Sequence, residues 1–264
     1  MGPRPVHGAK MLSRSRKAAV TTLVAAALGL MACGAQVAST GSGTLSGSGT
    51  LSGSLSTCTV RVTPDCTGYS YSNPSPGTVV VTAPKSSGPD NREFFWARQG
   101  HEEADPTVCA TFASGEGIDQ QGIVVRLHTS RNGIVTAITV TRNIWLDGFD
   151  VFNFHVWNMA ANPASPFTQF GSTIVPSLPE QPEVYPLSMC VRTVRATNLV
   201  QFVVWTKDKQ RPKWGSTSQG GEASIPAGVP TTGRSGWFVG HLAPGSSMTY
   251  TNLTVDGKTP VGLP

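Results

Sequence analysis

The chain has 264 residues, with 20 Lys and Arg against 15 Asp and Glu, and its sequence pI is about 9.1. Five of the basic residues and none of the acidic ones precede Cys33, so the rest of the chain carries no net charge. The basic pI therefore comes from the N-terminal segment and gives no electrostatic reason to expect nucleic-acid binding.

Residues 1–32 have the pattern of an export signal. The basic residues Arg14, Arg16 and Lys17 precede the apolar run Ala18–Leu30. This run is short for a membrane-spanning helix but suits the apolar region of a signal peptide. Met11 is an alternative start to Met1, because a signal beginning there has the usual length.

The apolar run ends in Leu30-Met31-Ala32-Cys33. This tetrapeptide resembles the lipobox of bacterial lipoproteins, with an aliphatic residue at position −3 and a small one at −1 before the cysteine. The resemblance implies that Cys33 receives a diacylglycerol and becomes the new N-terminus. The protein would then be anchored to the extracytoplasmic face of the cell membrane. An ordinary secretory signal with an incidental cysteine is the alternative.

Residues 33–57 are predicted to be a flexible tether. They contain a tandem repeat, Gly43–Ser48 followed by Gly49–Ser54, without charged, aromatic or proline residues. Such a composition buries too little apolar surface to offset the entropy of ordering the backbone. A random chain of this length spans roughly 25–30 Å, enough to hold a domain away from a membrane surface.

Residues 58–264 are predicted to form one domain with four cysteines. An even number of cysteines in an exported protein favours two disulfides, with three possible pairings. We expect a local bridge between Cys58 and Cys66 and a long-range bridge between Cys109 and Cys190. Free thiols or a metal site are less favoured because the sequence has no C-x-x-C spacing.

Short strands separated by turn signals recur along this domain. The expected strands outside the central segment are Thr78–Thr82, Glu93–Ala97, Glu183–Val194, Leu199–Thr206, Gly236–His241 and Met248–Val255. Only Pro106–Ala113 is predicted to be a short helix, and Pro163–Pro182 to be a connection. With 20 Pro and 29 Gly, this pattern predicts an all-β fold, an antiparallel two-sheet sandwich of the jelly-roll kind.

The last strands carry a family resemblance. Gly236–Asp256 ends in Tyr250-Thr-Asn252-Leu253-Thr-Val255, which is similar to the closing strands of concanavalin A-like (laminin-G-like) domains. The resemblance implies a twisted sandwich with a concave face, a face that binds glycans in many members of that group.

Gly122–Asn158 is predicted to be a three-stranded meander. Asn132-Gly133 favours a two-residue hairpin turn, which would place Leu127 opposite Ile138 and Val125 opposite Val140. An odd-numbered loop around Asp147-Gly148 would then place Val140 opposite Val156 and Arg142 beside Phe154, near the end of the sheet.

In this register, one face of the meander combines aromatic rings with amides, imidazoles and a guanidinium. Aromatic faces stack on sugar rings, and the polar groups bond hydroxyls. A cover by a second layer, or simple exposure to solvent, would explain the same face. The predicted glycan-binding residues are Arg126, Asn143, Trp145, Asn153, His155 and Trp157.

No catalytic motif is present. The nearest match to a glycosidase carboxylate pattern, Glu103-Ala-Asp105, lacks a third carboxylate and is followed by Pro106. We therefore expect no catalytic residue, metal or cofactor, and favour a polysaccharide-binding module. A glycan hydrolase with catalytic residues distant in sequence and a structural envelope protein are the alternatives.

Overall fold

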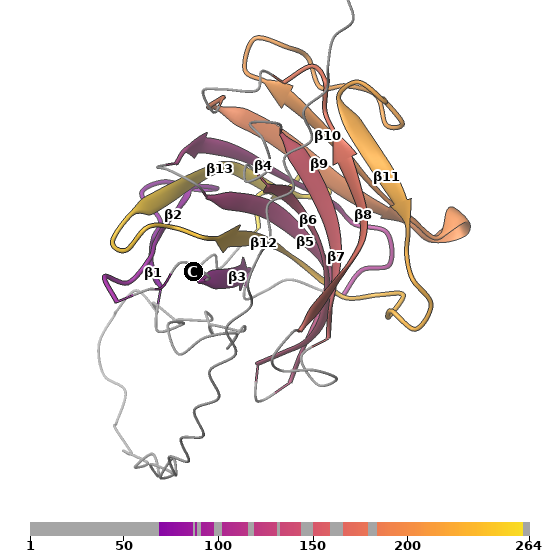
Figure 1. The fold of residues 1–264 in the computed structure, drawn as a ribbon, viewed down its shortest axis with the longest axis horizontal. Helices are drawn as coiled ribbons and strands as arrows, with labels where there is room; N and C mark the ends of the chain where they lie inside the picture. The colour runs from indigo at the N-terminus through magenta and orange to yellow at the C-terminus, as the bar shows by residue number, and fades with distance from the viewer. Residues whose placement is uncertain are drawn as a thin grey trace, which may run out of the picture. The chain divides into compact units, whose positions relative to one another are not determined.

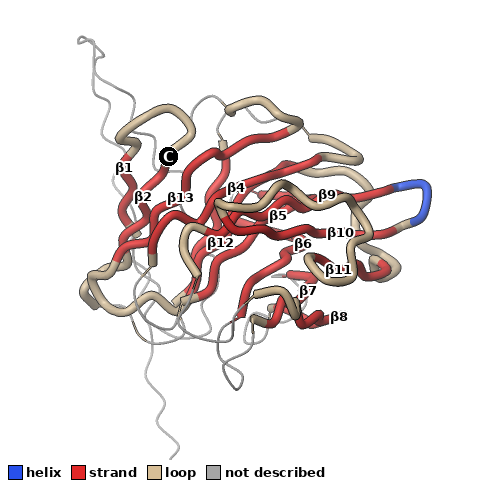
Figure 2. Tube along the Cα trace, turned by 90° about the horizontal axis from the view of Figure 1, so that it is seen from above, coloured by secondary structure: helices blue, strands red, loops and turns tan. Residues whose placement is uncertain are grey.

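The computed structural model describes residues 69–86, 88, 91–97, 102–115, 119–130, 133–143, 150–158, 166–178 and 184–260. Over these ranges the regular structure is strand, apart from one helix, the single 3-10 turn η1 (Arg195–Thr197) (Figure 2). No helix in this part of the chain is long and apolar enough to cross a membrane. The predicted signal, Cys33, the tether, Cys58 and Cys66 all lie outside the described residues.

Two antiparallel sheets make up the domain, which confirms the predicted two-sheet sandwich (Figure 1). The seven-stranded sheet has the order β1 (Ser70–Ser72), β2 (Val79–Thr82), β13 (Ser247–Val255), β4 (Thr107–Ser114), β9 (Leu187–Val194), β10 (Leu199–Thr206) and β11 (Gly220–Ser224). The six-stranded sheet has the order β3 (Arg92–Trp96), β12 (Arg234–Gly240), β5 (Gln120–Ser130), β6 (Gly133–Asn143), β7 (Val151–Asn158) and β8 (Phe167–Ile174).

The main core lies between the two sheets. Alternate residues of each strand point into it, as the two-residue period of a strand requires. Phe152 of β7 stacks on Phe202 of β10 with ring centroids 4.7 Å apart, and Phe95 of β3 meets Tyr250 of β13 at 5.1 Å. These aromatic pairs join one sheet to the other.

A disulfide joins Cys109 of β4 to Cys190 of β9, which confirms the predicted long-range bridge. The two residues are directly opposite each other in the ladder, with Cα atoms 4.1 Å apart. The bridge therefore links neighbouring strands of one sheet that are 81 residues apart in sequence.

The predicted helix at Pro106–Ala113 is wrong, because this segment forms strand β4. Val108, Ala110 and Phe112 are buried and alternate with less buried residues, which is the period of a strand. Hydrogen bonding to both β9 and β13 fixes the segment in the interior of its sheet.

The predicted connection at Pro163–Pro182 is also wrong in part, because it contains strand β8. This strand lies at the edge of its sheet and pairs with β7 alone. An edge strand tolerates polar residues on both faces. The polar residues Thr168, Gln169, Ser172 and Thr173 therefore removed the apolar alternation that would have indicated a strand.

The meander forms as predicted, but its register differs by two residues. Val125 lies opposite Ile138, and Val140 lies opposite Ile123 on one side and Phe154 on the other. A shift of two residues leaves these side chains on their predicted face. A β-bulge between Val125 and His128 then moves Leu127, which was predicted on the same face as Val125, out of the main core. The last pair of the hairpin is Ser130 with Gly133. A two-residue turn formed by Asn132-Gly133 would instead have required each strand to pair one residue further along the chain.

Arg142 lies near the end of the sheet, as predicted, but opposite Phe152 rather than Phe154. It is fully buried, and its Nε and Nη2 donate to the two carboxylate oxygens of Asp150 at 2.8 and 3.0 Å. This two-point pairing compensates both charges where the sheet ends.

Candidate functional site

The six-stranded sheet curls so strongly that side chains on its two edges meet over its outer face. The guanidinium carbon of Arg92 on β3 lies 5.3 Å from the ring centroid of Phe167 on β8. In a flat sheet, strands five places apart would be separated by about 24 Å. The outer face is therefore a trough rather than an open surface.

An aromatic cluster fills one end of this trough. Phe94 of β3 meets Trp157 of β7 edge-on at 5.0 Å, and Trp157 also lies 4.9 Å from Phe167. The cluster consists of Phe94, Trp96, Val124, Leu127, Ala137, Trp157 and Phe238, with Phe167 packed against it. The sheet thus has a second, smaller core on the face opposite the main one.

Trp157 belongs to this second core. It is only 2% exposed, and its indole N–H donates to Thr139 Oγ1 at 2.9 Å. The expectation of an open stacking platform on the wet side of the sheet is therefore wrong for this residue. The curl of the sheet, which brings Phe94 onto the indole ring, is the physical reason.

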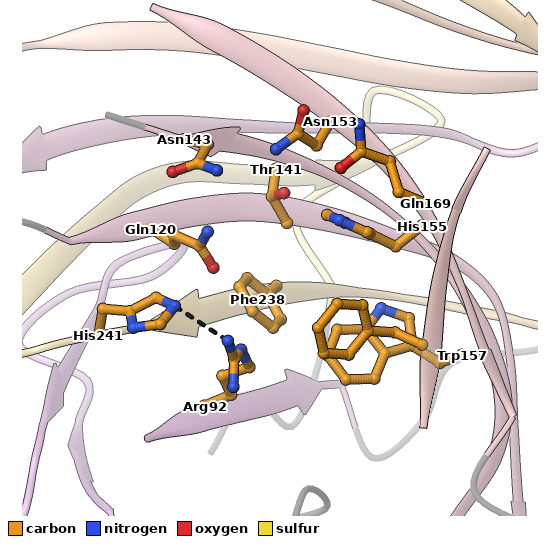
Figure 3. Close-up of a pocket in the computed structure, with 11 residues that line it drawn as sticks. Arg92, Gln120, Thr141, Asn143, Asn153, His155, Trp157, Gln169, Phe238 and His241 are labelled. Carbon is orange, nitrogen blue, oxygen red and sulfur yellow. Dashed lines mark hydrogen bonds between the residues drawn. The ribbon is translucent and has the colours of Figure 1, made fainter. Parts of the chain in front are cut away.

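A polar pocket of about 330 Å³ occupies the trough beside the aromatic cluster (Figure 3). All six strands of the sheet or the residues next to them contribute to it. The lining residues are Arg92, Gln120, Thr141, Asn143, Asn153, His155, Trp157, Phe167, Gln169, Phe238 and His241. The amides of Asn143, Asn153 and Gln169 lie around the upper part of the pocket, and the rings of Phe238 and Trp157 lie below them (Figure 3).

Gly240, the last residue of β12, helps to leave this space open. Gly240 lies between Arg92 and Gln120 in one cross-strand row. A Cβ atom at this position would lie 3.2 Å from both Arg92 Cγ and Phe238 Cζ. Any larger residue would project between the two polar side chains and reduce the pocket.

The floor of the pocket is buried and polar. Thr141, Asn153 and His155 are each less than 9% exposed. Among the described residues, neither Thr141 Oγ1 nor His155 Nδ1 has a hydrogen-bond partner. Burial, and to a lesser degree the positive charge of Arg92, lower the pKa of His155 to about 4, so its imidazole is uncharged at neutral pH.

The contacts that hold Arg92 at the rim include one with His241 and one with Phe167. Arg92 Nη2 donates to His241 Nε2 at 3.2 Å (Figure 3), and the guanidinium lies over the ring of Phe167. The backbone beside it is fixed by Asn91, whose Nδ2 donates to the carbonyl of Leu242 at 2.8 Å. The guanidinium therefore has a defined position rather than that of an unrestrained surface side chain.

Four of the predicted glycan-binding residues line this pocket, namely Asn143, Asn153, His155 and Trp157. Trp145 lies outside the described residues. Arg126 is placed elsewhere, because a β-bulge interrupts the pairing between Val125 and His128 and Arg126 adopts a φ of 53°. Its electrostatic neighbours are Asp105 and Arg195, and Leu127 joins the aromatic cluster beyond the bulge.

The sequence interpretation missed Arg92, Gln120, Phe167, Gln169, Phe238 and His241, which also line the pocket. The alternation of Arg92, Phe94 and Trp96 on β3 could have indicated that these residues share a face. No turn or alternation in the nearby sequence, however, indicates that they lie beside the meander.

The residues described in the pocket lining include no carboxylate. A glycosidase needs two, one on each side of the scissile bond. Within the described part of the chain, no group of three or more His, Cys, Asp or Glu residues is arranged to hold a metal ion. The pocket as described can form hydrogen bonds, stack and pair with an anion.

No protein-family model matches the chain, and no curated protein sequence matches it. Solved structures that resemble it include the carbohydrate-binding module CBM66 from Bacillus subtilis, with a TM-score of 0.42, 10% identity and coverage of 72% of this chain and 96% of that one. A legume lectin-like domain from Entamoeba histolytica has a TM-score of 0.42, 8% identity and coverage of 71% and 88%. Peanut lectin has a TM-score of 0.38, 11% identity and coverage of 70% and 90%.

Proposed function

We propose that this chain is a glycan-binding module that holds a short stretch of saccharide in the trough of the six-stranded sheet. We further propose that lipid on Cys33 anchors it to the extracytoplasmic face of the cell membrane. The anchor is supported by Leu30-Met31-Ala32-Cys33 after an apolar run, and the flexible composition of residues 34–57 would give the domain reach.

The composition of the pocket carries the binding proposal. Side-chain amides both donate and accept hydrogen bonds, as saccharide hydroxyls do. Four amides line the pocket, from Gln120, Asn143, Asn153 and Gln169, and Phe167 forms part of an apolar wall. A volume of about 330 Å³ is at the lower end of the usual range for small-ligand sites.

The unpartnered polar atoms of the floor support the same conclusion. Leaving a buried donor or acceptor unpaired costs about 1–3 kcal/mol. Thr141 Oγ1 and His155 Nδ1 are two such atoms beneath the rim amides. A hydroxylated ligand, directly or through a bound water, would form hydrogen bonds with both atoms. A purely structural face would avoid this free-energy cost by having apolar residues here.

The test is binding of the exported domain to a panel of soluble polysaccharides, measured by affinity electrophoresis and then by calorimetry. Asn143→Ala and Gln169→Ala, which change polar groups near the rim, should each weaken binding several-fold without lowering the melting temperature. Gln210→Ala, in an exposed loop of the other sheet, is the matched control and should bind as the wild type does. Failure of the wild type to bind any member of a broad panel would refute the proposal in favour of a structural role.

A further inference from the structure

The pocket lining has a charge asymmetry that a site for neutral sugars does not need. Arg92 contributes a guanidinium, and neither Asp nor Glu is among the described residues that line the pocket. The other polar groups of these residues are amides, a hydroxyl, imidazoles and the indole N–H of Trp157. The lining is therefore suited to an acceptor-rich ligand with negative charge.

Arg92 is also arranged as a recognition group rather than as a general surface charge. Guanidinium N–H groups form a planar fork that matches the two oxygens of a carboxylate. The ring of Phe167 lies beneath the guanidinium, and His241 accepts a hydrogen bond from Nη2, so both restrict the side chain. Restricting the side chain in advance reduces the entropy lost when a ligand binds.

The neighbours of Arg92 supply hydrogen bonds to the rest of a ligand. Gln120 lies across the strip left open by Gly240, and Asn143 follows it in the same cross-strand row. The row thus begins with a cation and continues with two amides. A sugar ring with a carboxylate at one end and hydroxyls along its edge has the same order of groups.

We propose that the ligand of the trough is an acidic saccharide, one that contains uronic acid residues, and that Arg92 pairs with the uronate carboxylate. This inference rests on the proposed glycan-binding function and narrows it to a ligand class. Burial first, and the charge of Arg92 second, lower the pKa of His155, so the floor of the pocket lies within the field of that guanidinium.

The experiment compares ligands that differ only in the charge of one group. Oligogalacturonate and its methyl ester have the same sugar ring, but esterification removes the negative charge. The same measurement is made with oligomers of mannuronate and guluronate, and with a sulfated neutral oligosaccharide. The wild type should bind at least one free uronate series roughly tenfold or more tightly than the ester or the sulfated sugar.

The matched variants are Arg92→Gln and Arg211→Gln. Arg92→Gln should abolish the preference for the free acid, and Arg92→Lys should restore it only in part, because an ammonium lacks the planar fork. Arg211 lies over the ring of Trp214 in the connection between β10 and β11 of the other sheet, so Arg211→Gln changes net charge equally and should keep the preference. Thermal melting of each variant shows whether a loss of binding reflects loss of the fold.

The outcomes separate the two proposals. Binding of neutral and esterified glycans as tightly as free uronates would overturn the acidic-ligand inference while leaving glycan binding intact. A preference for sulfated over carboxylated sugars, or a preference for uronates that Arg92→Gln retains, would also overturn it. Absence of binding to every glycan would refute both proposals.

Discussion

Arg92 and Phe167 lie on the two edge strands of the six-stranded sheet, yet the guanidinium carbon of one is 5.3 Å from the ring centroid of the other. This contact spans the trough from β3 to β8. It shows that the outer face of the sheet is enclosed by its own curvature, without a covering helix among the described residues. The candidate ligand pocket and the second aromatic core are both products of that enclosure.

Trp157→Ala should destabilise the domain strongly. The indole ring is buried against Phe94 and Phe167 and donates a hydrogen bond to Thr139. Truncating a buried Trp typically costs about 3–5 kcal/mol of unfolding free energy. Denaturant unfolding measures this loss. Trp214→Ala is the matched control, since that ring contacts Arg192 and Arg211 and belongs to neither core, and it should cost far less.

Glu93→Gln should stabilise the protein at alkaline pH. Burial raises the pKa of Glu93 from 4.5 to about 8, so the native state keeps a proton that the unfolded chain releases. Stability should therefore fall as the pH rises from about 4.5 to about 8, by at most about 1.4 kcal/mol per pH unit.

Thermal melts of the wild type and Glu93→Gln across this pH range provide the measurement. The variant should match the wild type near pH 4 and exceed it near pH 8. Glu102→Gln makes the same change of charge at an exposed position and should leave the wild-type slope unchanged. Parallel melting curves for the wild type and Glu93→Gln would contradict the prediction.

His155 should produce the opposite dependence at acidic pH. Burial and Arg92 lower its pKa from 6.5 to about 4, so between these values the unfolded chain binds a proton that the native state does not. The stability contributed by His155 is thus present above pH 6.5 and is lost as the pH falls towards 4. In His155→Gln the free energy of unfolding should fall less between pH 6.5 and pH 4 than in the wild type. The reference is pH 8, where the side chain at position 155 is uncharged in both proteins.

Removing the disulfide with the double variant Cys109→Ala/Cys190→Ala should lower the free energy of unfolding. The bridge closes a loop of 81 residues, for which the chain-entropy model gives about 4–5 kcal/mol as an upper estimate. Urea unfolding under non-reducing conditions tests this. Peptide mapping that joined Cys109 to Cys58 or Cys66 would contradict the pairing itself.

Cys33→Ala should release the protein from membranes or block its maturation. The expectation follows from the lipobox-like Leu30-Met31-Ala32-Cys33, because several acyl chains at about 0.8 kcal/mol per buried CH₂ make an effectively permanent anchor. Detergent partitioning of the variant and the wild type measures this. Equal partitioning into the detergent phase would disprove lipidation, whereas Cys58→Ala should partition as the wild type does.

The fold class could be predicted because a strand repeats every two residues, and this signal survives errors of register. Val125, Ile138 and Val140 reached the main core although their pairing was shifted by two residues. Prediction failed where the period was masked. Pro106 before Val108 favoured a helix start in what is strand β4. Strand β8 has no buried residues, so its sequence lacks the alternation of apolar and polar residues that indicates a strand.

The site could be predicted only within the meander. Asn143, Asn153 and His155 follow from alternation along adjacent strands. Arg92, Phe167 and His241 join them through the curvature of the whole sheet, which depends on packing between distant strands. The bulge at Arg126 and the burial of Trp157 depend on the same long-range geometry, so neither was visible in a local pattern.

The way the trough closes has a consequence for how its width can change. In a sheet whose edge strands hydrogen-bond to each other, strand number and register fix the enclosed diameter. Here the edges meet through one guanidinium and one ring, so the aperture is a property of two side chains. Single substitutions at positions 92 and 167 should therefore change the width of the trough, with every backbone ladder unchanged.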